Sequence, residues 1–213
     1  MKSLLSVSVC FLLLVCSCAP SLTKGCRRGT PFLLPKEELP AMVPFSERIR
    51  TYNMTIDFMR KHFSGLLVVK QTQAATCRIL FSTHFGLSLF DLEVGPDSMQ
   101  VHHCIEPLNK KKILDLLGRD FAVLSGLSLE KENKAVPYLC AKSPHREIYY
   151  IETPAFKGYY RKDKPTGRVQ EIRIGSGLRK TTFRSEPGPA GNVTSIRICH
   201  TGLRLSIGLD PLP

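Results

Sequence analysis

The chain of 213 residues lacks tryptophan and the short motifs that identify most enzyme classes. It has no GxSxG nucleophile elbow, HExxH zinc motif, P-loop or glycine-rich dinucleotide fingerprint. No two cysteines have the CxxC spacing of zinc sites and thioredoxin-like redox motifs. We therefore predict that the chain is not an enzyme and uses no cofactor and no metal. A Cys/His nucleophilic pair stays open as an alternative, because such residues meet only in three dimensions.

Long apolar runs are also lacking after the N-terminus, where one run covers residues 4–17. It follows Lys2 and is shorter than the roughly 20 residues that a membrane-spanning helix needs. A positive residue followed by a short apolar run is typical of a secretory signal peptide. We therefore predict that residues 1–17 are a signal peptide and that the remainder is exported.

The junction after this run predicts a lipid anchor. Ser17 directly precedes Cys18, and Val15 lies three positions before that cysteine. This resembles the lipobox of bacterial lipoproteins, in which the cysteine is acylated and becomes the first residue. Each buried acyl methylene contributes about 0.8 kcal/mol, so several chains on Cys18 would make a lasting anchor. Ala19 follows in place of aspartate, which by the enterobacterial sorting rule implies the outer membrane, with the domain facing the periplasm.

A second interpretation of the N-terminus is a plain signal peptide, with Cys18 an ordinary cysteine. The chain would then be a eukaryotic secreted, disulfide-bonded protein. The tripeptides at Asn53 and Asn192 match the N-glycosylation pattern and would matter in that case. Mass spectrometry of the mature N-terminus separates the two interpretations.

Five cysteines follow Cys18, and their odd number leaves at least one thiol unpaired: Cys26, Cys77, Cys104, Cys140 and Cys199. An exported compartment permits disulfides, so one or two pairs are expected, with the pairing undetermined. His102 and Cys104 share one face of a predicted strand, but no third ligand is visible. This pattern does not predict a metal site.

The chain carries 30 Lys and Arg against 18 Asp and Glu, for a formal net charge of +12. The cations are spread along the sequence and no nucleic-acid-binding module is recognisable, so we predict no nucleic-acid partner. Residues 18–44 hold several prolines and no periodicity. We interpret them as a lipidated, Pro-rich tether in front of a single domain at residues 45–213.

Short runs with strand-like alternation dominate that domain. About eleven of them follow one another between residues 52 and 210, separated by turn residues. Adjacent short strands favour antiparallel pairing, because parallel strands need long crossovers. One mid-chain segment differs: Asn109 could cap a helix in which Ile113, Leu117 and Phe121 recur at helical spacing, and Gly118 is a point where it could split. The sequence thus predicts a mainly β domain with one helix on its sheet.

Four segments resemble the LolA/LolB family of lipoprotein localisation factors: "SGLLVVKQ", "ILFSTHFGLSLFDLEV", "KKKILDLLGRDFAVLSGL" and "SIRICHTGLRLSIGLD". The resemblance spans roughly residues 50–209. It implies an open, curved antiparallel sheet, a half-barrel, that is covered by the helix and encloses an apolar cavity for acyl chains. In the receptor member of the family, an apolar residue on a protruding hairpin loop enters the membrane, and Phe85 has the matching position.

These inferences combine into a functional hypothesis. We expect an outer-membrane lipoprotein that binds acyl chains of a lipid or lipoprotein cargo, with a role in lipoprotein transfer. The expected cavity residues are Ile79 and Phe81 on one strand and Leu87 and Leu89 on the next. Phe85 is the expected membrane contact, unless the neighbouring helix covers it. The main alternative is a structural or interaction lipoprotein whose interior is filled by its own side chains.

Overall fold

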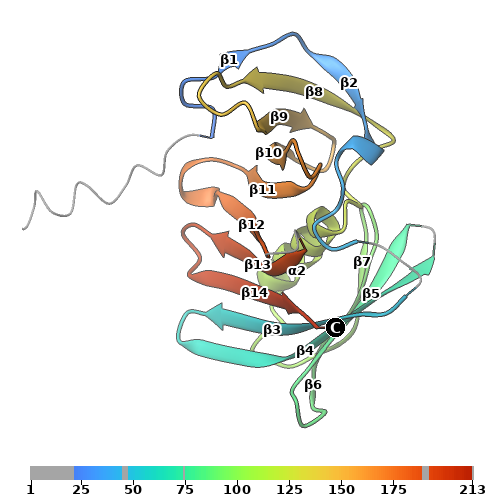
Figure 1. The fold of residues 1–213 in the computed structure, drawn as a ribbon. Coiled ribbons are helices and arrows are strands. Elements are labelled where there is room, and N and C mark those ends of the chain that lie inside the picture. The colour runs from blue at the N-terminus through green and yellow to red at the C-terminus, as the bar shows by residue number, and fades with distance from the viewer. Residues whose placement is uncertain (1–21, 45–47, 74, 189–191, 213) are drawn as a thin grey trace, which may run out of the picture.

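The computed structural model describes residues 22–44, 48–73, 75–188 and 192–212. In these residues, fourteen strands form one antiparallel sheet, and a single α-helix lies against it (Figure 1). The strands are β1 (Arg27–Arg28), β2 (Phe32–Pro35), β3 (Arg50–Phe58), β4 (Lys61–Gln73), β5 (Thr76–Ser82), β6 (Ser88–Val94), β7 (Met99–Cys104), β8 (Glu132–Leu139), β9 (Arg146–Glu152), β10 (Lys157–Asp163), β11 (Val169–Ile174), β12 (Thr181–Pro187), β13 (Val193–His200) and β14 (Leu205–Pro211). The helix is α2 (Lys111–Leu124), and two short 3-10 turns complete the elements: η1 (Lys36–Glu38) and η2 (Gly177–Arg179).

Two antiparallel meanders build the sheet. Strands β3 to β7 form one and β8 to β14 the other, and they join where β14 pairs with β3. The sheet begins at β1 and β2, which both pair with β8, and ends at β7. It curls round α2 without closing into a barrel (Figure 1). The predicted fold class, an open curved antiparallel sheet covered by a mid-chain helix, is confirmed.

Three strands were not expected from the sequence, namely β1, β2 and β8. The first two fall within residues 18–44, so that most of the expected tether belongs to the fold. Leu34, Met42 and Val43 are buried in the core, and a disulfide joins Cys26 to Cys140. Prolines do not prevent this arrangement, because an edge strand tolerates a residue without an N–H at its end. The tether boundary at residue 44 is therefore wrong. Residues 1–21, including Cys18 and the expected signal peptide, lie outside the described residues.

Helix α2 runs unbroken through Gly118. A Cβ at this position would lie 2.7 Å from the Sδ of Met99, so glycine allows the helix to lie close to β7. The residue at the N-terminal boundary is Lys110, with no side-chain hydrogen bond, so the expected cap at Asn109 is not formed. The backbone N–H of Asn109 instead bonds to the carbonyls of Ile105 and Glu106, which places it in the preceding turn.

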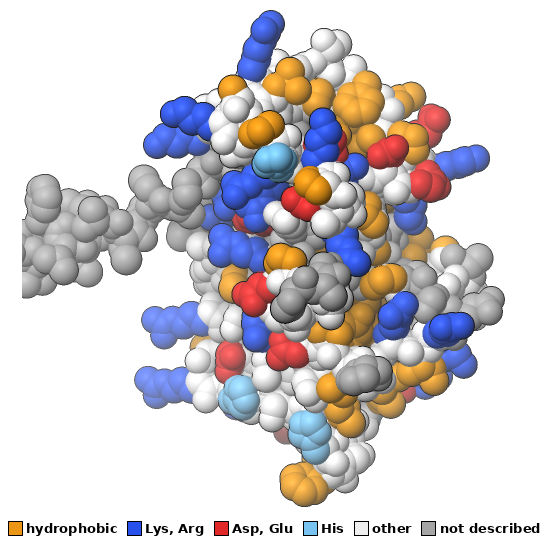
Figure 2. Space-filling view, viewed as in Figure 1, with side chains coloured by type: hydrophobic (Ala, Val, Ile, Leu, Met, Phe, Trp, Pro, Cys, Tyr) orange, Lys and Arg blue, Asp and Glu red, His pale blue; other side chains and the backbone are white. Residues whose placement is uncertain are grey.

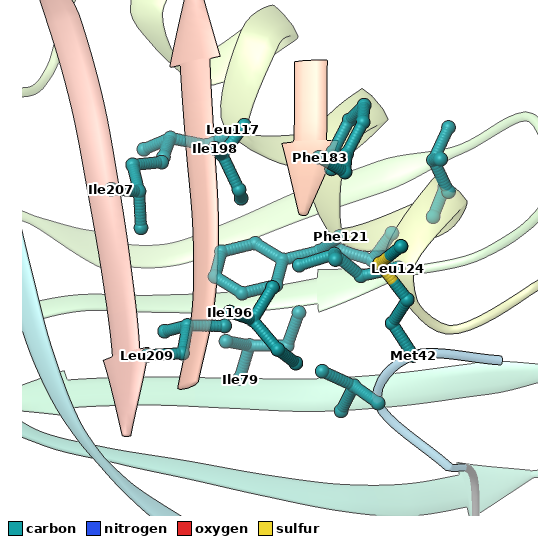
Figure 3. Packing of buried hydrophobic residues seen from close by; sticks show 14 of the residues in the cluster. Met42, Ile79, Leu117, Phe121, Leu124, Phe183, Ile196, Ile198, Ile207 and Leu209 are labelled. Atoms are coloured by element: carbon teal, nitrogen blue, oxygen red, sulfur yellow. The ribbon is translucent and has the colours of Figure 1, made fainter. Parts of the chain in front are cut away.

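The interior between helix and sheet is filled. Figure 3 shows side chains of α2 among those of strands from both meanders. The helix contributes Ile113, Leu117, Phe121 and Leu124 to this core, all on its apolar face. Such a face gains free energy from burial at roughly 25 cal/mol per Å² of apolar surface, which holds α2 on the sheet.

Candidate functional site

The hairpin between β5 and β6 carries the most exposed apolar side chain described. Phe85 is 100% exposed and Leu87 is 63% exposed. The turn is ordered by hydrogen bonds from the N–H of Leu87 to the hydroxyl of Thr83 (3.1 Å) and from the N–H of Gly86 to its carbonyl (2.9 Å). Gly86 has a φ of +86°, a left-handed conformation that glycine adopts without steric cost.

This hairpin projects from the rest of the molecule (Figure 1), and a hydrophobic side chain lies at its end (Figure 2). Helix α2 does not cover Phe85, because no part of the chain shields that side chain from solvent among the described residues. A single exposed apolar side chain is common on protein surfaces, so exposure alone does not identify a contact. Phe85 is free to reach a membrane, and the contact itself stays a prediction.

The four expected cavity residues do not line one open space. Ile79 and Phe81 are 0% exposed, and Leu89 is 4% exposed, whereas Leu87 points into solvent. The ring of Phe81 lies 5.3 Å from that of Phe90 on β6. Phe90 in turn lies 6.4 Å from Phe121 of α2. Helix side chains thus occupy the space that an acyl chain would need beside Ile79 and Phe81.

A buried polar network connects α2 to the second meander. His200 Nε2 lies 2.7 Å from Asp120 Oδ2, and its Nδ1 lies 3.0 Å from the hydroxyl of Thr181. Arg119 completes the network by donating to that hydroxyl from Nη2 (3.3 Å). We call Arg119, Asp120, Thr181 and His200 the latch, because two residues of the helix meet one residue each of β12 and β13.

The electrostatics of the latch follow from its burial. Asp120 is fully buried, and the loss of solvent raises its pKa, while the hydrogen bond from His200 opposes this shift. When Asp120 is ionised it only accepts, so Nε2 of His200 carries the hydrogen. In the tautomer with its hydrogen on Nε2, the ring accepts from the Thr181 hydroxyl at Nδ1. Each of these hydrogen bonds has one donor and one acceptor, whereas Asp120 Oδ1 is buried without a hydrogen-bond partner among the described residues and has Arg119 Nη2 3.9 Å away.

A cavity of about 640 Å³ opens beside the latch, between the helix and the turn after β13. Leu116 and Leu203 supply apolar wall, and the latch residues Arg119, Thr181 and His200 supply polar wall. The cavity thus opens next to the latch. A ligand that entered it would contact side chains of α2 before it reached the hydrophobic core.

The latch was not predicted from the sequence, although Asp120 and His200 each interrupt an apolar pattern. Asp120 stands between the apolar positions Leu117 and Phe121 of the helix. His200 continues the inward alternation of Ile196 and Ile198 on β13. A polar residue at an apolar position signals a buried partner. The two positions are eighty residues apart, so only the fold shows that they meet.

Among the described residues, no three His, Cys, Asp or Glu side chains are arranged to hold a metal ion. His102 instead faces Glu93, with 3.2 Å between Nε2 and Oε2. The described part of the chain also contains no helix that is long and apolar enough to cross a membrane. Its free cysteines are Cys77, Cys104 and Cys199, of which only Cys199 is exposed.

Comparison with solved structures gives a distant likeness. No family profile and no curated protein matches the chain. The crystal structure of a DUF1329 family protein from Desulfovibrio piger matches with 11% sequence identity and a TM-score of 0.39. The match covers 78% of this chain and 85% of that one. At this level of similarity, the comparison adds nothing to the argument about function.

Proposed function

We propose that this chain is an outer-membrane lipoprotein, anchored through an acylated Cys18, that handles the acyl chains of a lipid or lipoprotein. It acts without catalysis and without a cofactor, with its domain in the periplasm. The observation that carries the proposal is the fully exposed Phe85 at the end of a hydrogen-bonded, projecting hairpin. An exposed aromatic residue on a hairpin tip is suited to enter a bilayer or an acyl-chain cargo, because burial of its ring from water is favourable.

The rest of the site supports this proposal if α2 can move away from the concave face of the sheet and return, and so acts as a cover. The apolar face of the helix occupies the concave side of an open sheet, where acyl chains could replace it. Exchange of one apolar partner for another is nearly neutral in free energy, because burial is non-directional. The latch then sets the cost of opening, since moving the helix separates Asp120 from His200. A site of this kind would release its cargo when the helix returns.

Lipid extraction and mass spectrometry of the purified chain tests this function. We expect co-purified lipid, and we expect an intact-mass measurement to find diacylglycerol on Cys18. A fluorescent fatty acid probe should bind more tightly to His200→Gln than to the wild type, since that substitution weakens the hold on the helix. Absence of lipid together with no probe binding to either form would exclude acyl-chain handling.

A second candidate function is favoured by the complete burial of Ile79 and Phe81. In that case the interior is permanently filled, and the chain is an anchored interaction protein. A reversible disulfide between α2 and β7 distinguishes acyl-chain binding under the helix from a permanently filled interior. A Cβ at Gly118 would lie 3.5 Å from the Cβ of Met99, within the range that a disulfide spans.

The disulfide joins the pair Gly118→Cys and Met99→Cys, compared in its oxidised and reduced forms. If α2 is a cover, oxidation should abolish binding of the fatty acid probe, and reduction should restore it. Equal binding in both forms would show that acyl chains bind without helix movement. The matched control is the wild type in the same two redox states, because reduction also opens the native Cys26–Cys140 disulfide.

A further inference from the structure

A second pocket lies on the other face of the sheet, away from the helix and its core. It has a volume of about 470 Å³ and is bounded by the Cys26–Cys140 disulfide and by strands β9 to β11. Five cationic side chains line it and no acidic side chain does: Lys24, Lys142, Arg146, Arg161 and Arg173. Figure 2 shows Lys and Arg side chains gathered on this side of the molecule, beside the turns at the ends of β9 to β11. We call these five residues the basic pocket.

Strand pairing explains how the cations come together. Arg161 on β10 pairs with Glu171 on β11, and Glu171 pairs with Arg184 on β12, so the three side chains share the outer face. Glu171 is buried, lying 3.0 Å from Arg161 and 2.6 Å from Arg173. It also contacts Arg184 at 3.5 Å. One carboxylate thus serves three guanidinium groups, and positive charge remains in excess.

Arg161 shows this excess most clearly. Its side chain is mostly buried, and its Nε is a buried donor without a hydrogen-bond partner among the described residues. Burial lowers the pKa of Arg161, Glu171 raises it, and the like charges of Arg146, Arg173 and Arg184 lower it further. The guanidinium remains protonated, because arginine does not lose its proton in proteins. A buried donor amid repelling cations is stabilised by an anion.

We propose that the basic pocket binds a multiply charged phosphate group. Arginine matches phosphate oxygens with its planar array of donors, and lysine adds charge. Five cations against one shared carboxylate favour a diphosphate or phosphomonoester over a single negative charge. This site lies on the opposite face from the proposed acyl-chain site and does not depend on it.

Two sources carry such a group, namely a lipid headgroup and a free phosphate compound. A headgroup is within reach if Cys18 is acylated, since Lys24 follows it by at most about 20 Å of extended chain. Binding of a lipid headgroup rests on the proposed anchor at Cys18, whereas binding of free diphosphate does not. Failure of the proposed anchor can therefore be told from failure of the phosphate site.

Isothermal titration calorimetry on the full chain in detergent tests the site with three probes. They are inorganic pyrophosphate, dihexanoylphosphatidate and the zwitterionic dihexanoylphosphatidylcholine. The test variant is Lys24→Gln with Arg146→Gln, whose side chains are exposed, so that folding is preserved. The matched control is Lys70→Gln with Lys131→Gln, which removes the same charge from exposed lysines elsewhere.

We expect pyrophosphate to bind the wild type and the control alike, and to bind the test variant at least about tenfold more weakly. Tighter binding of the phosphatidate than of pyrophosphate identifies a lipid headgroup as the ligand, and the reverse identifies a free phosphate compound. If neither anion binds, or if both double variants weaken binding equally, the charge acts non-specifically and the proposal is overturned.

Discussion

Replacement of Phe85 by glutamate tests the hairpin tip with little risk to the fold. The side chain makes no packing contact to lose, since it is fully exposed. Substitutions at such positions change the free energy of unfolding by no more than about 0.5 kcal/mol. We therefore expect Phe85→Glu to unfold at the same denaturant concentration as the wild type.

Membrane affinity should respond very differently. Moving a phenylalanine side chain from water to an apolar medium contributes about 1.5–3 kcal/mol, which corresponds to roughly 10- to 150-fold in a binding constant. Glutamate loses this contribution and adds a charge that resists desolvation. Since acyl chains on Cys18 would mask an effect of this size, the measurement uses a Cys18→Ser background and co-sedimentation with phosphatidylcholine vesicles.

The matched control is Ile49→Glu, which adds the same charge at an exposed apolar position next to β3, between the two ends of the sheet. Only the Phe85 variant should lose vesicle binding. If both variants bind as the wild type does, the tip does not enter membranes. If Phe85→Glu instead destabilises the protein by about 2 kcal/mol or more, Phe85 has a packing role and the reasoning fails.

Three further predictions concern the stability of the fold. Asp120→Ala leaves His200 without its buried partner and should lower the free energy of unfolding by about 3 kcal/mol, measured by urea denaturation; a change below about 1 kcal/mol would contradict a latch. Cys26→Ser should cost about 2–4 kcal/mol in a non-reducing melt and nothing in a reducing one. The Arg78 hydrogen bond lowers the pKa of Asp91, so its stabilisation is present above the ordinary pKa of about 3.9 and is lost as pH falls through the folded value. Asp91→Asn should therefore destabilise at about pH 6 and have less effect at about pH 3, and a pH-independent difference would refute this assignment.

The fold class was predictable because alternation of polar and apolar residues follows strand geometry directly. Residues such as Ile196 and Ile198 show the period of two without any tertiary information. Strand β8 gives a weaker signal, since its sequence "ENKAVPYL" begins with polar residues and contains Pro137. Its formation depends on neighbours on both sides, with β9 along one edge and β1 and β2 along the other. Local pattern does not contain that information.

The candidate site likewise combines features set by local sequence with features set by contacts between distant segments. The turn at Gly86 was predictable because it is local, whereas the sequence left open whether α2 covers Phe85. The fate of Ile79 and Phe81 depends on what α2 places against them, which is a contact between distant segments. The latch and the basic pocket likewise join strands through pairings that sequence spacing does not define. Sequence therefore located the turn, whereas exposure and burial at the site followed from the fold.

The position of the disulfide changes how an anchored chain can work. A tether reaching to residue 44 would allow the domain to move far from its membrane, with an extended reach of roughly 90 Å. Cys26 is instead fixed to Cys140, and β1 and β2 follow directly in the sheet. Between Cys18 and Leu22, the first described residue, an extended chain spans only about 14 Å. A chain acylated at Cys18 would thus hold the β8 end of its sheet close to the bilayer. The β5–β6 hairpin belongs to the other end of the sheet. In such an acylated chain, the proposed basic pocket would lie near the headgroups and Phe85 would offer a second point of contact.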